Sequence, residues 1–133
     1  MKNQKITWIT SALAVLAIIL LISAMPGNDI ITQDKDTAVV NTQLLGKNVK
    51  GFRSMTPLKI YIRKNKVVKI EALPNHETPK YFNRAKALLA SYIGKTVSKA
   101  AKMDVDGVSG ATYSSNALKK NVQLGLDYYK QHK

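Results

Sequence analysis

Residues 58–73 read LKIYIRKNKVVKIEAL, and this stretch decides the fold. Apolar and polar side chains alternate over residues 58–63, and strand-favouring residues return over residues 67–73. Alternation with a period of two is typical of a β-strand with one buried face. Lys64 and Asn65 separate the two runs and suit a tight turn. The stretch therefore predicts an antiparallel β-hairpin.

The sequence before the hairpin gives weaker signals. Residues 39–52 contain two adjacent leucines, but their two glycines indicate bends or bulges if this part forms a strand. Residues 26–37 begin with Pro-Gly, contain three aspartates and show no sustained helical or alternating pattern. We therefore expect residues 26–43 to form a linker and residues 44–133 to form the folded domain.

Two longer helices are expected after the hairpin. Residues 81–93 carry apolar side chains at helical spacing, and residues 115–130 do the same with lysines on the opposite face. Gly94 suits the end of the first helix, and Thr96 suits the cap of a short helical piece through Ala101. We expect the aromatic residues of the first helix to lie in the core. The expected fold class is α+β, a small antiparallel sheet packed with helices.

Residues 106–116 read DGVSGATYSSN and precede the last predicted helix. Two glycines allow a backbone turn, and Ser114, Ser115 and Asn116 are all good N-caps. A helix start offers unpaired N–H groups and the positive end of the helix dipole, and both stabilise an anion such as a phosphate. Thr112 lies at this start, so the sequence predicts an anion-binding site beside its hydroxyl.

The pattern Asp106-x-x-Ser109-Gly110-Ala111-Thr112 resembles the flavinylation motif of FMN-binding domains. This family occurs in the flavin subunits of sodium-pumping NADH:quinone oxidoreductases and in related ion-translocating complexes. The resemblance implies that the threonine hydroxyl is joined to the phosphate of FMN. It also implies that a separate FMN transferase, using FAD and magnesium, makes this bond and recognises the other motif positions. The alternative is an ordinary glycine-containing turn with a serine cap.

A second segment, His76-Glu77-Thr78-Pro79, resembles a shortened form of the family's His-x-Glu-Thr-Pro-Gly loop, with Lys80 in place of the glycine. That loop lies near the flavin in the family, so the resemblance makes its first three residues candidates for contacting or covering the ring. For His76 alone, a surface turn is the alternative. The candidate cofactor-binding residues are Asp106, Ser109, Gly110, Ala111, Thr112, Ser114, Ser115, His76, Glu77 and Thr78. No catalytic or metal-ligating residues are expected.

The N-terminal residues form a candidate membrane segment. Residues 6–25 carry no charge, and at ~1.5 Å per residue a helix here reaches ~30 Å, the hydrocarbon thickness of a bilayer. Lysines precede this run, which favours a cytoplasmic N-terminus and a domain on the extracytoplasmic side. We expect residues 1–25 to be a single-pass transmembrane anchor in the cell membrane. The alternative is a secretory signal, because Ser23 and Ala24 suit a cleavage site.

The amino-acid composition limits the kinds of bond, metal site and partner that the chain can have. The chain has no cysteine, which excludes disulfides, thiolate metal sites and a lipid-modified cysteine. The 21 lysines and arginines outnumber the 8 acidic residues, giving a formal net charge of +13 that attracts anions. Dispersed lysines also keep a domain soluble, and no dense basic block is present.

Two functions fit these observations. The first is a membrane-anchored extracytoplasmic electron-transfer flavoprotein with covalent FMN, acting as an electron carrier or redox subunit rather than as a stand-alone enzyme. Its expected partners are the FMN transferase and redox proteins or a membrane electron-transport complex. The alternative is a basic, membrane-tethered module that binds anionic lipid, cell-wall polymer or nucleic acid. We expect no nucleic-acid partner, because the chain lacks an aromatic-interleaved basic stripe.

Overall fold

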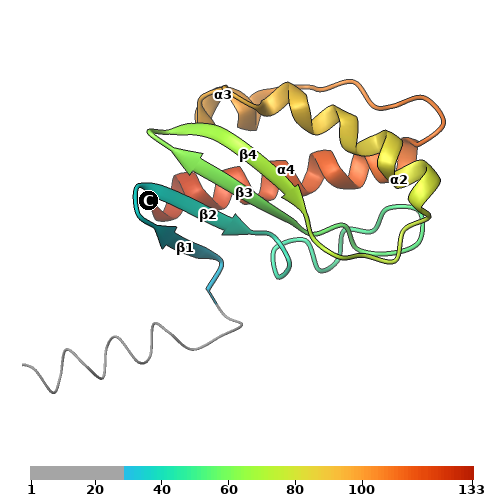
Figure 1. The fold of residues 1–133 in the computed structure, drawn as a ribbon, viewed down its shortest axis with the longest axis horizontal. Coiled ribbons are helices and arrows are strands. Elements are labelled where there is room, and N and C mark those ends of the chain that lie inside the picture. The colour runs from blue at the N-terminus through green and yellow to red at the C-terminus, as the bar shows by residue number, and fades with distance from the viewer. Residues whose placement is uncertain (1–28) are drawn as a thin grey trace, which may run out of the picture.

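The computed structural model describes residues 29–133. The segment 1–25, expected to be a membrane anchor or signal, lies outside the described residues. Within residues 29–133, no helix is both long enough and apolar enough to cross a bilayer. This part of the chain has the expected α+β fold, a four-stranded antiparallel sheet packed with helices (Figure 1).

The sheet is a meander in which each strand pairs with the next along the chain. The predicted hairpin is confirmed, and the Lys64-Asn65 turn joins its two strands. Both turn residues have positive φ, 51° and 61°, as in the two-residue hairpin turns whose twist matches that of the strands. In order, the strands are β1 (Ile31–Asp34), β2 (Thr37–Asn41), β3 (Leu58–Arg63) and β4 (Lys66–Ala72).

The first two strands fall within the segment expected to be a linker, so that expectation is wrong for residues 31–41. Val40 pairs with Ile31 on one side and with Ile60 on the other, and its side chain is fully buried. Each strand is so short that only about two side chains face the core, too few for alternation to stand out in the sequence. Pairing with β3 therefore decides this structure.

The helices follow the predicted order with changes in detail. The segment expected to be one helix over residues 81–93 is an α-helix that continues as a 3₁₀-helix. The predicted short helix is confirmed, and the Thr96 hydroxyl accepts a hydrogen bond from the backbone N–H of Lys99 at 3.3 Å. Gly94 has φ 83°, as a helix-ending glycine should. The helical elements are α2 (Pro79–Ala85), η1 (Lys86–Tyr92), α3 (Val97–Lys102) and α4 (Thr112–His132).

The core lies between the sheet and α4, which runs along one face of the sheet (Figure 1). Apolar side chains at alternate positions of β3 meet the buried side of α4. Gly125 of α4 permits close approach, because a Cβ there would lie 2.7 Å from Ile60 Cδ1. The fully buried side chains of this contact are Leu58, Ile60, Leu118, Val122 and Leu126.

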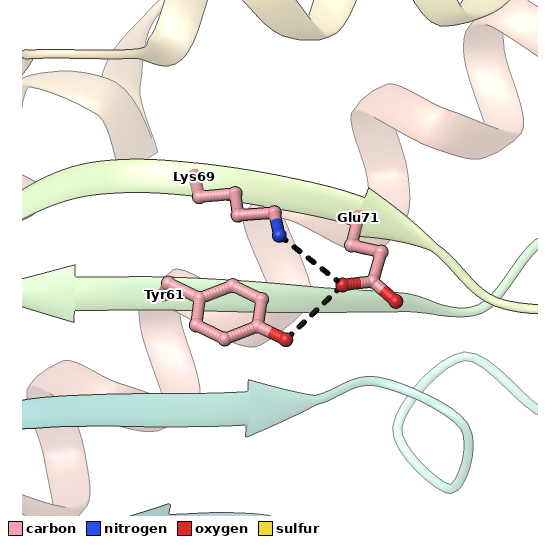
Figure 2. Close-up of polar contacts among 3 residues, drawn as sticks. All are labelled: Tyr61, Lys69 and Glu71. Atoms are coloured by element: carbon pink, nitrogen blue, oxygen red, sulfur yellow. Dashed lines mark hydrogen bonds and ion pairs between the residues drawn. The ribbon is translucent and has the colours of Figure 1, made fainter. Parts of the chain in front are cut away.

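The opposite face of the sheet is polar, and no helix of residues 29–133 covers it (Figure 1). Figure 2 shows Tyr61 of β3 beside Lys69 and Glu71 of β4 on this face. The Tyr61 hydroxyl donates to Glu71 Oε2 at 3.1 Å, and Lys69 Nζ lies 3.6 Å from the same oxygen. Partial burial, followed by the hydrogen bond and the charge of Glu71, raises the pKa of Tyr61. The alternation of β3 thus separates a buried face from a solvated one.

The long connection between β2 and β3 is a loop fixed against α4, rather than a bulged strand. The Asn121 side-chain N–H₂ donates to the Thr56 carbonyl at 3.0 Å and to the Thr56 hydroxyl at 3.1 Å. Asn121 Oδ1 has no hydrogen-bond partner among residues 29–133. It lies 2.0 Å from the point where a Cβ on Gly46 would be. Gly46 is therefore needed for close packing. This loop reaches the end of the molecule where α4 begins (Figure 1).

Candidate functional site

The predicted turn before the last helix is present. The Ala111 backbone N–H donates to the Val108 carbonyl at 3.0 Å, and Gly110 in the third position has φ 81°. A positive φ at this position is the signature of a type II turn and favours glycine. The Ser115 hydroxyl accepts a hydrogen bond from the Val108 N–H at 3.0 Å, which fastens the turn to the helix.

Helix α4 begins earlier than predicted. Its first residue is Thr112, and its N-cap residue is Ala111, whose methyl side chain cannot accept a hydrogen bond. The prediction that Ser114, Ser115 or Asn116 caps the helix is therefore wrong. The two serine side chains are buried inside the first turns, where each is bonded to a residue from another part of the chain. The helix consequently starts without a side-chain cap.

Three backbone donors are left free at this start. Within the described part of the chain, the N–H groups of Thr112, Tyr113 and Ser114 have no hydrogen-bond acceptor. These groups and the positive end of the helix dipole favour an anion at this position. Thr112 is exposed, so its hydroxyl lies beside the predicted anion site and is accessible from solvent.

An aromatic pocket opens beside the helix start. Its volume is about 360 Å³, and Phe52 is one of the residues that line it. The Phe52 ring centroid is 6.5 Å from that of Tyr81 and 6.0 Å from that of Tyr113. These three residues are 60%, 38% and 68% exposed, an unusual amount of grouped aromatic surface for a small domain. The pocket-lining residues are Phe52, Tyr81, Gly110, Ala111, Thr112, Tyr113 and Ser114.

The sequence did not identify these aromatic residues. The expectation that the aromatics of the first helix lie in the core is correct for Phe82 and Tyr92 but wrong for Tyr81. Tyr113 is adjacent to Thr112 in the motif, which was a usable signal. Phe52 gave none, because its place in the pocket depends on a loop that packs against distant parts of the chain.

Two positive side chains lie close to the pocket. The Lys80 ammonium is 5.8 Å from the Tyr81 ring centroid. One Arg84 guanidinium nitrogen is 3.6 Å from the point where a Cβ on Gly110 would lie. Among residues 29–133 the only ion pair joins Lys69 and Glu71 on the outer face of the sheet, so neither cation has an acidic partner there. The pocket therefore combines aromatic surface with unpaired positive charge.

Glu77 joins two of the predicted segments. Its side chain is 6% exposed, and its carboxylate accepts hydrogen bonds from the backbone N–H groups of Phe52, Arg53 and Ser54. It also accepts a hydrogen bond from the Ser114 hydroxyl at 3.0 Å. The structure thus brings together two candidates from different motifs. Glu77 therefore connects the loop of residues 52–54 to the start of α4, and it is not one of the residues that line the pocket.

Five other candidates lie outside the pocket lining, and one of them is Ser115, whose buried hydroxyl accepts the Val108 N–H. The exposed His76 donates its backbone N–H to the Ser54 hydroxyl at 3.0 Å, and Thr78 is the N-cap residue of α2 without a side-chain cap bond. Asp106 and Ser109 are exposed on the segment before α4. Of the predicted residues, the structure therefore places Gly110, Ala111, Thr112 and Ser114 around the pocket.

Comparison with known proteins gives one match. The family model described as FMN-binding domain matches residues 51–127, more than half of the 133-residue chain. The matched range begins next to Phe52 and includes both motifs and most of α4, whereas β1 and β2 precede it. No curated protein and no solved structure matches the chain.

Proposed function

Since the chain belongs to the FMN-binding domain family and is thus a flavin-binding protein, we propose that it carries FMN covalently on Thr112 and transfers electrons between redox partners. The observation that carries this proposal is the position of Thr112. It is the exposed first residue of α4, and it also lines the aromatic pocket. One attached group can therefore reach both the free helix amides and the aromatic surface.

The helix start fits the phosphate end of FMN. Three free N–H groups and the nearby Arg84 guanidinium supply hydrogen-bond donors and positive charge for a phosphodiester anion. Gly110 has no side chain, so its backbone is uncovered next to Arg84. The Thr112 hydroxyl supplies the oxygen of the phosphoester, which a separate FMN transferase forms by breaking the pyrophosphate bond of FAD, with AMP as the leaving group and loss of the hydroxyl proton. Asp106 and Ser109 are exposed and open to recognition by that transferase.

The aromatic pocket fits the ring end. Phe52, Tyr81 and Tyr113 offer surfaces on which a planar ring system can pack. FMN supplies the redox chemistry when bound, while the protein provides binding, orientation and electrostatics. The open pocket leaves part of a bound ring accessible, which suits electron exchange with another protein. Residues 6–25 would anchor the domain to the membrane on its extracytoplasmic side.

The test is the mass of the full-length chain made together with an FMN transferase. We expect it to gain the mass of one FMN less one water, and proteolysis should place this mass on the peptide containing Thr112. Thr112→Ser keeps a hydroxyl and should retain some modification. Thr112→Ala should abolish the modification but leave the circular dichroism spectrum unchanged, because this exposed side chain contributes little to the core.

An unmodified wild-type chain, made beside a transferase that modifies a known substrate, would contradict the proposal. The basic binding module would then be the better account, and salt-sensitive binding to polyanions would be its signature.

A further inference from the structure

Glu77 occupies the inside of the loop that presents Phe52. The loop is closed by a backbone hydrogen bond from Gly51 N–H to the Ser54 carbonyl at 2.8 Å. Three successive N–H groups of this loop converge on the Glu77 carboxylate, as in the backbone nests that bind anions. Oε1 accepts from Phe52 at 2.7 Å, and Oε2 accepts from Arg53 and from Ser54 at 3.0 Å.

The same carboxylate reaches α4. Glu77 Oε1 also accepts the Ser114 hydroxyl at 3.0 Å, so each carboxylate oxygen holds two donors. A carboxylate has about four lone-pair positions, and all of them are used here. Glu77 therefore has no acceptor capacity left for a ligand. The expectation that Glu77 contacts or covers the flavin ring stays a prediction, and the carboxylate is not among the residues that line the pocket.

The loop sequence is fitted to this carboxylate. A Cβ on Gly51 would lie 1.9 Å from Glu77 Oε1, so only glycine leaves room for the oxygen. Further bonds tie the two segments together. The Asn75 side-chain oxygen accepts the Glu77 backbone N–H at 3.0 Å, and the Ser54 hydroxyl accepts the His76 N–H at 3.0 Å. The position of Phe52 relative to α4 thus depends on one buried side chain.

We propose that Glu77 is a positioning residue of the flavin site, which holds the ring of Phe52 at the start of α4. This inference rests on the proposed function, because the pocket it shapes is the proposed flavin pocket. Glu77 acts through Phe52 and makes no contact with the cofactor. The carboxylate also supplies acceptors for three loop N–H groups that have no other acceptor among the described residues.

The loop can be tested in the native protein without any flavin. The N–H groups of Phe52, Arg53 and Ser54 should exchange with solvent deuterium at least roughly tenfold more slowly than that of Asn48, which has no acceptor among the described residues. Glu77→Gln places an N–H₂ group against two of the donors, so protection of these three amides should fall. Unprotected amides in the wild-type chain would overturn the proposal.

The flavin test is a titration of FMN into the full-length chain made without the transferase. We expect Glu77→Gln to weaken FMN binding by about tenfold, the effect of losing roughly one well-placed contact. Glu71→Gln is the matched control, since Glu71 is an exposed carboxylate on the far face of the sheet (Figure 2). It should leave both exchange and FMN binding unchanged.

A double-mutant cycle separates positioning from general stability. If Glu77 acts through Phe52, the tenfold loss from Glu77→Gln should largely disappear in a Phe52→Ala background. An equal loss in both backgrounds, or wild-type affinity in a folded Glu77→Gln variant, would overturn the proposal. Should Glu77→Gln fail to fold, Gly51→Ala displaces the carboxylate without removing it and takes its place in the cycle.

Failure of the proposed function gives a different result. If the wild-type chain made beside an active transferase carries no FMN while its loop amides are protected and Glu77→Gln exposes them, the flavin proposal fails and the loop assignment stands.

Discussion

Arg84 is the residue that would distinguish FMN from a flavin without a phosphate. Its guanidinium lies next to the Gly110 turn and has no acidic partner within residues 29–133. It is exposed, so a charge-assisted hydrogen bond to a phosphate is worth only about 1 kcal/mol after solvent screening. A phosphate-binding role predicts loss of affinity for FMN but not for riboflavin.

We expect Arg84→Met to weaken FMN binding about fivefold, as ~1 kcal/mol implies, and to leave riboflavin binding unchanged. Lys86→Met is the control, because Lys86 lies near the Phe82 ring rather than near the Gly110 turn. Fluorescence titration with both flavins measures the effect. An equal loss for FMN and riboflavin would show that Arg84 shapes the pocket instead of binding phosphate.

Tyr92 should make the fold sensitive to alkali. Burial, and secondarily the charge of Asp104, raises the pKa of Tyr92 to about 12, whereas the unfolded chain titrates near 10. The neutral form is favoured in the fold, so its stabilisation is complete below pH 10 and is lost as the pH rises from 10 to 12. Tyr92 lines a surface cavity of about 530 Å³, and solvent screening there limits the loss to about 1–2 kcal/mol.

Tyr92→Phe should therefore lose less stability than the wild-type chain between pH 10 and pH 12. Urea unfolding at a series of pH values measures this difference. Parallel curves for the two proteins would contradict the raised pKa.

Helix α4 combines two tasks that compete at its first turn. Its apolar side packs on the sheet, and its start leaves three N–H groups uncapped. Such groups cost helix stability but are available to an anion. Helix α3 differs in this respect, because the Thr96 side chain accepts a hydrogen bond from one of its first N–H groups. The difference suggests that the start of α4 is kept open for a ligand.

We expect Ala111→Ser to stabilise the fold by about 0.5–1 kcal/mol, since a serine at the N-cap accepts from a free amide. The same bond would compete with a phosphate and weaken FMN binding. Thr96→Ala is the opposite control and should cost about 1 kcal/mol without changing FMN binding. Urea unfolding and FMN titration measure both effects. An Ala111→Ser variant that gains stability and binds FMN as well as wild type would contradict this account.

At the scale of the whole molecule, β1 and β2 belong to the domain although the family match begins after them. Ala38 and Val40 of β2 are buried in the core, and β2 is hydrogen-bonded along the edge of β3. Removing them would expose the apolar core and leave β3 as an open edge strand.

A fragment of residues 29–133 should therefore fold, and a fragment of residues 44–133 should not. The burial and strand pairing lost with β1 and β2 come out of a stability margin of only about 5–15 kcal/mol for a typical small domain. Circular dichroism and cooperative thermal unfolding compare the two fragments. A cooperative transition in the shorter fragment would restore the interpretation of residues 31–41 as a linker.

The sequence by itself determined the elements whose signals are local. The period of two in residues 58–73 requires only that neighbouring side chains point to opposite faces, and the hairpin follows. Thr96 and Gly94 act on backbone groups a few residues away, so the short helix and the preceding helix end were also predictable. The turn before Thr112 belongs to the same class, whereas the first residue of α4 did not follow from the local cap signals.

Only the tertiary structure decided which residues surround Thr112. Phe52 and Tyr81 reach the pocket because the chain folds back on itself, and no local pattern separates an exposed pocket aromatic from a core aromatic. Glu77 and Ser114 are 37 residues apart, and their hydrogen bond exists only when the loop and α4 are packed together. A buried carboxylate needs hydrogen-bond donors, and the loop N–H groups and the Ser114 hydroxyl supply them to Glu77. Turns, helix caps and strand alternation depend on residues close together in the sequence, whereas contacts between distant residues depend on the packed core.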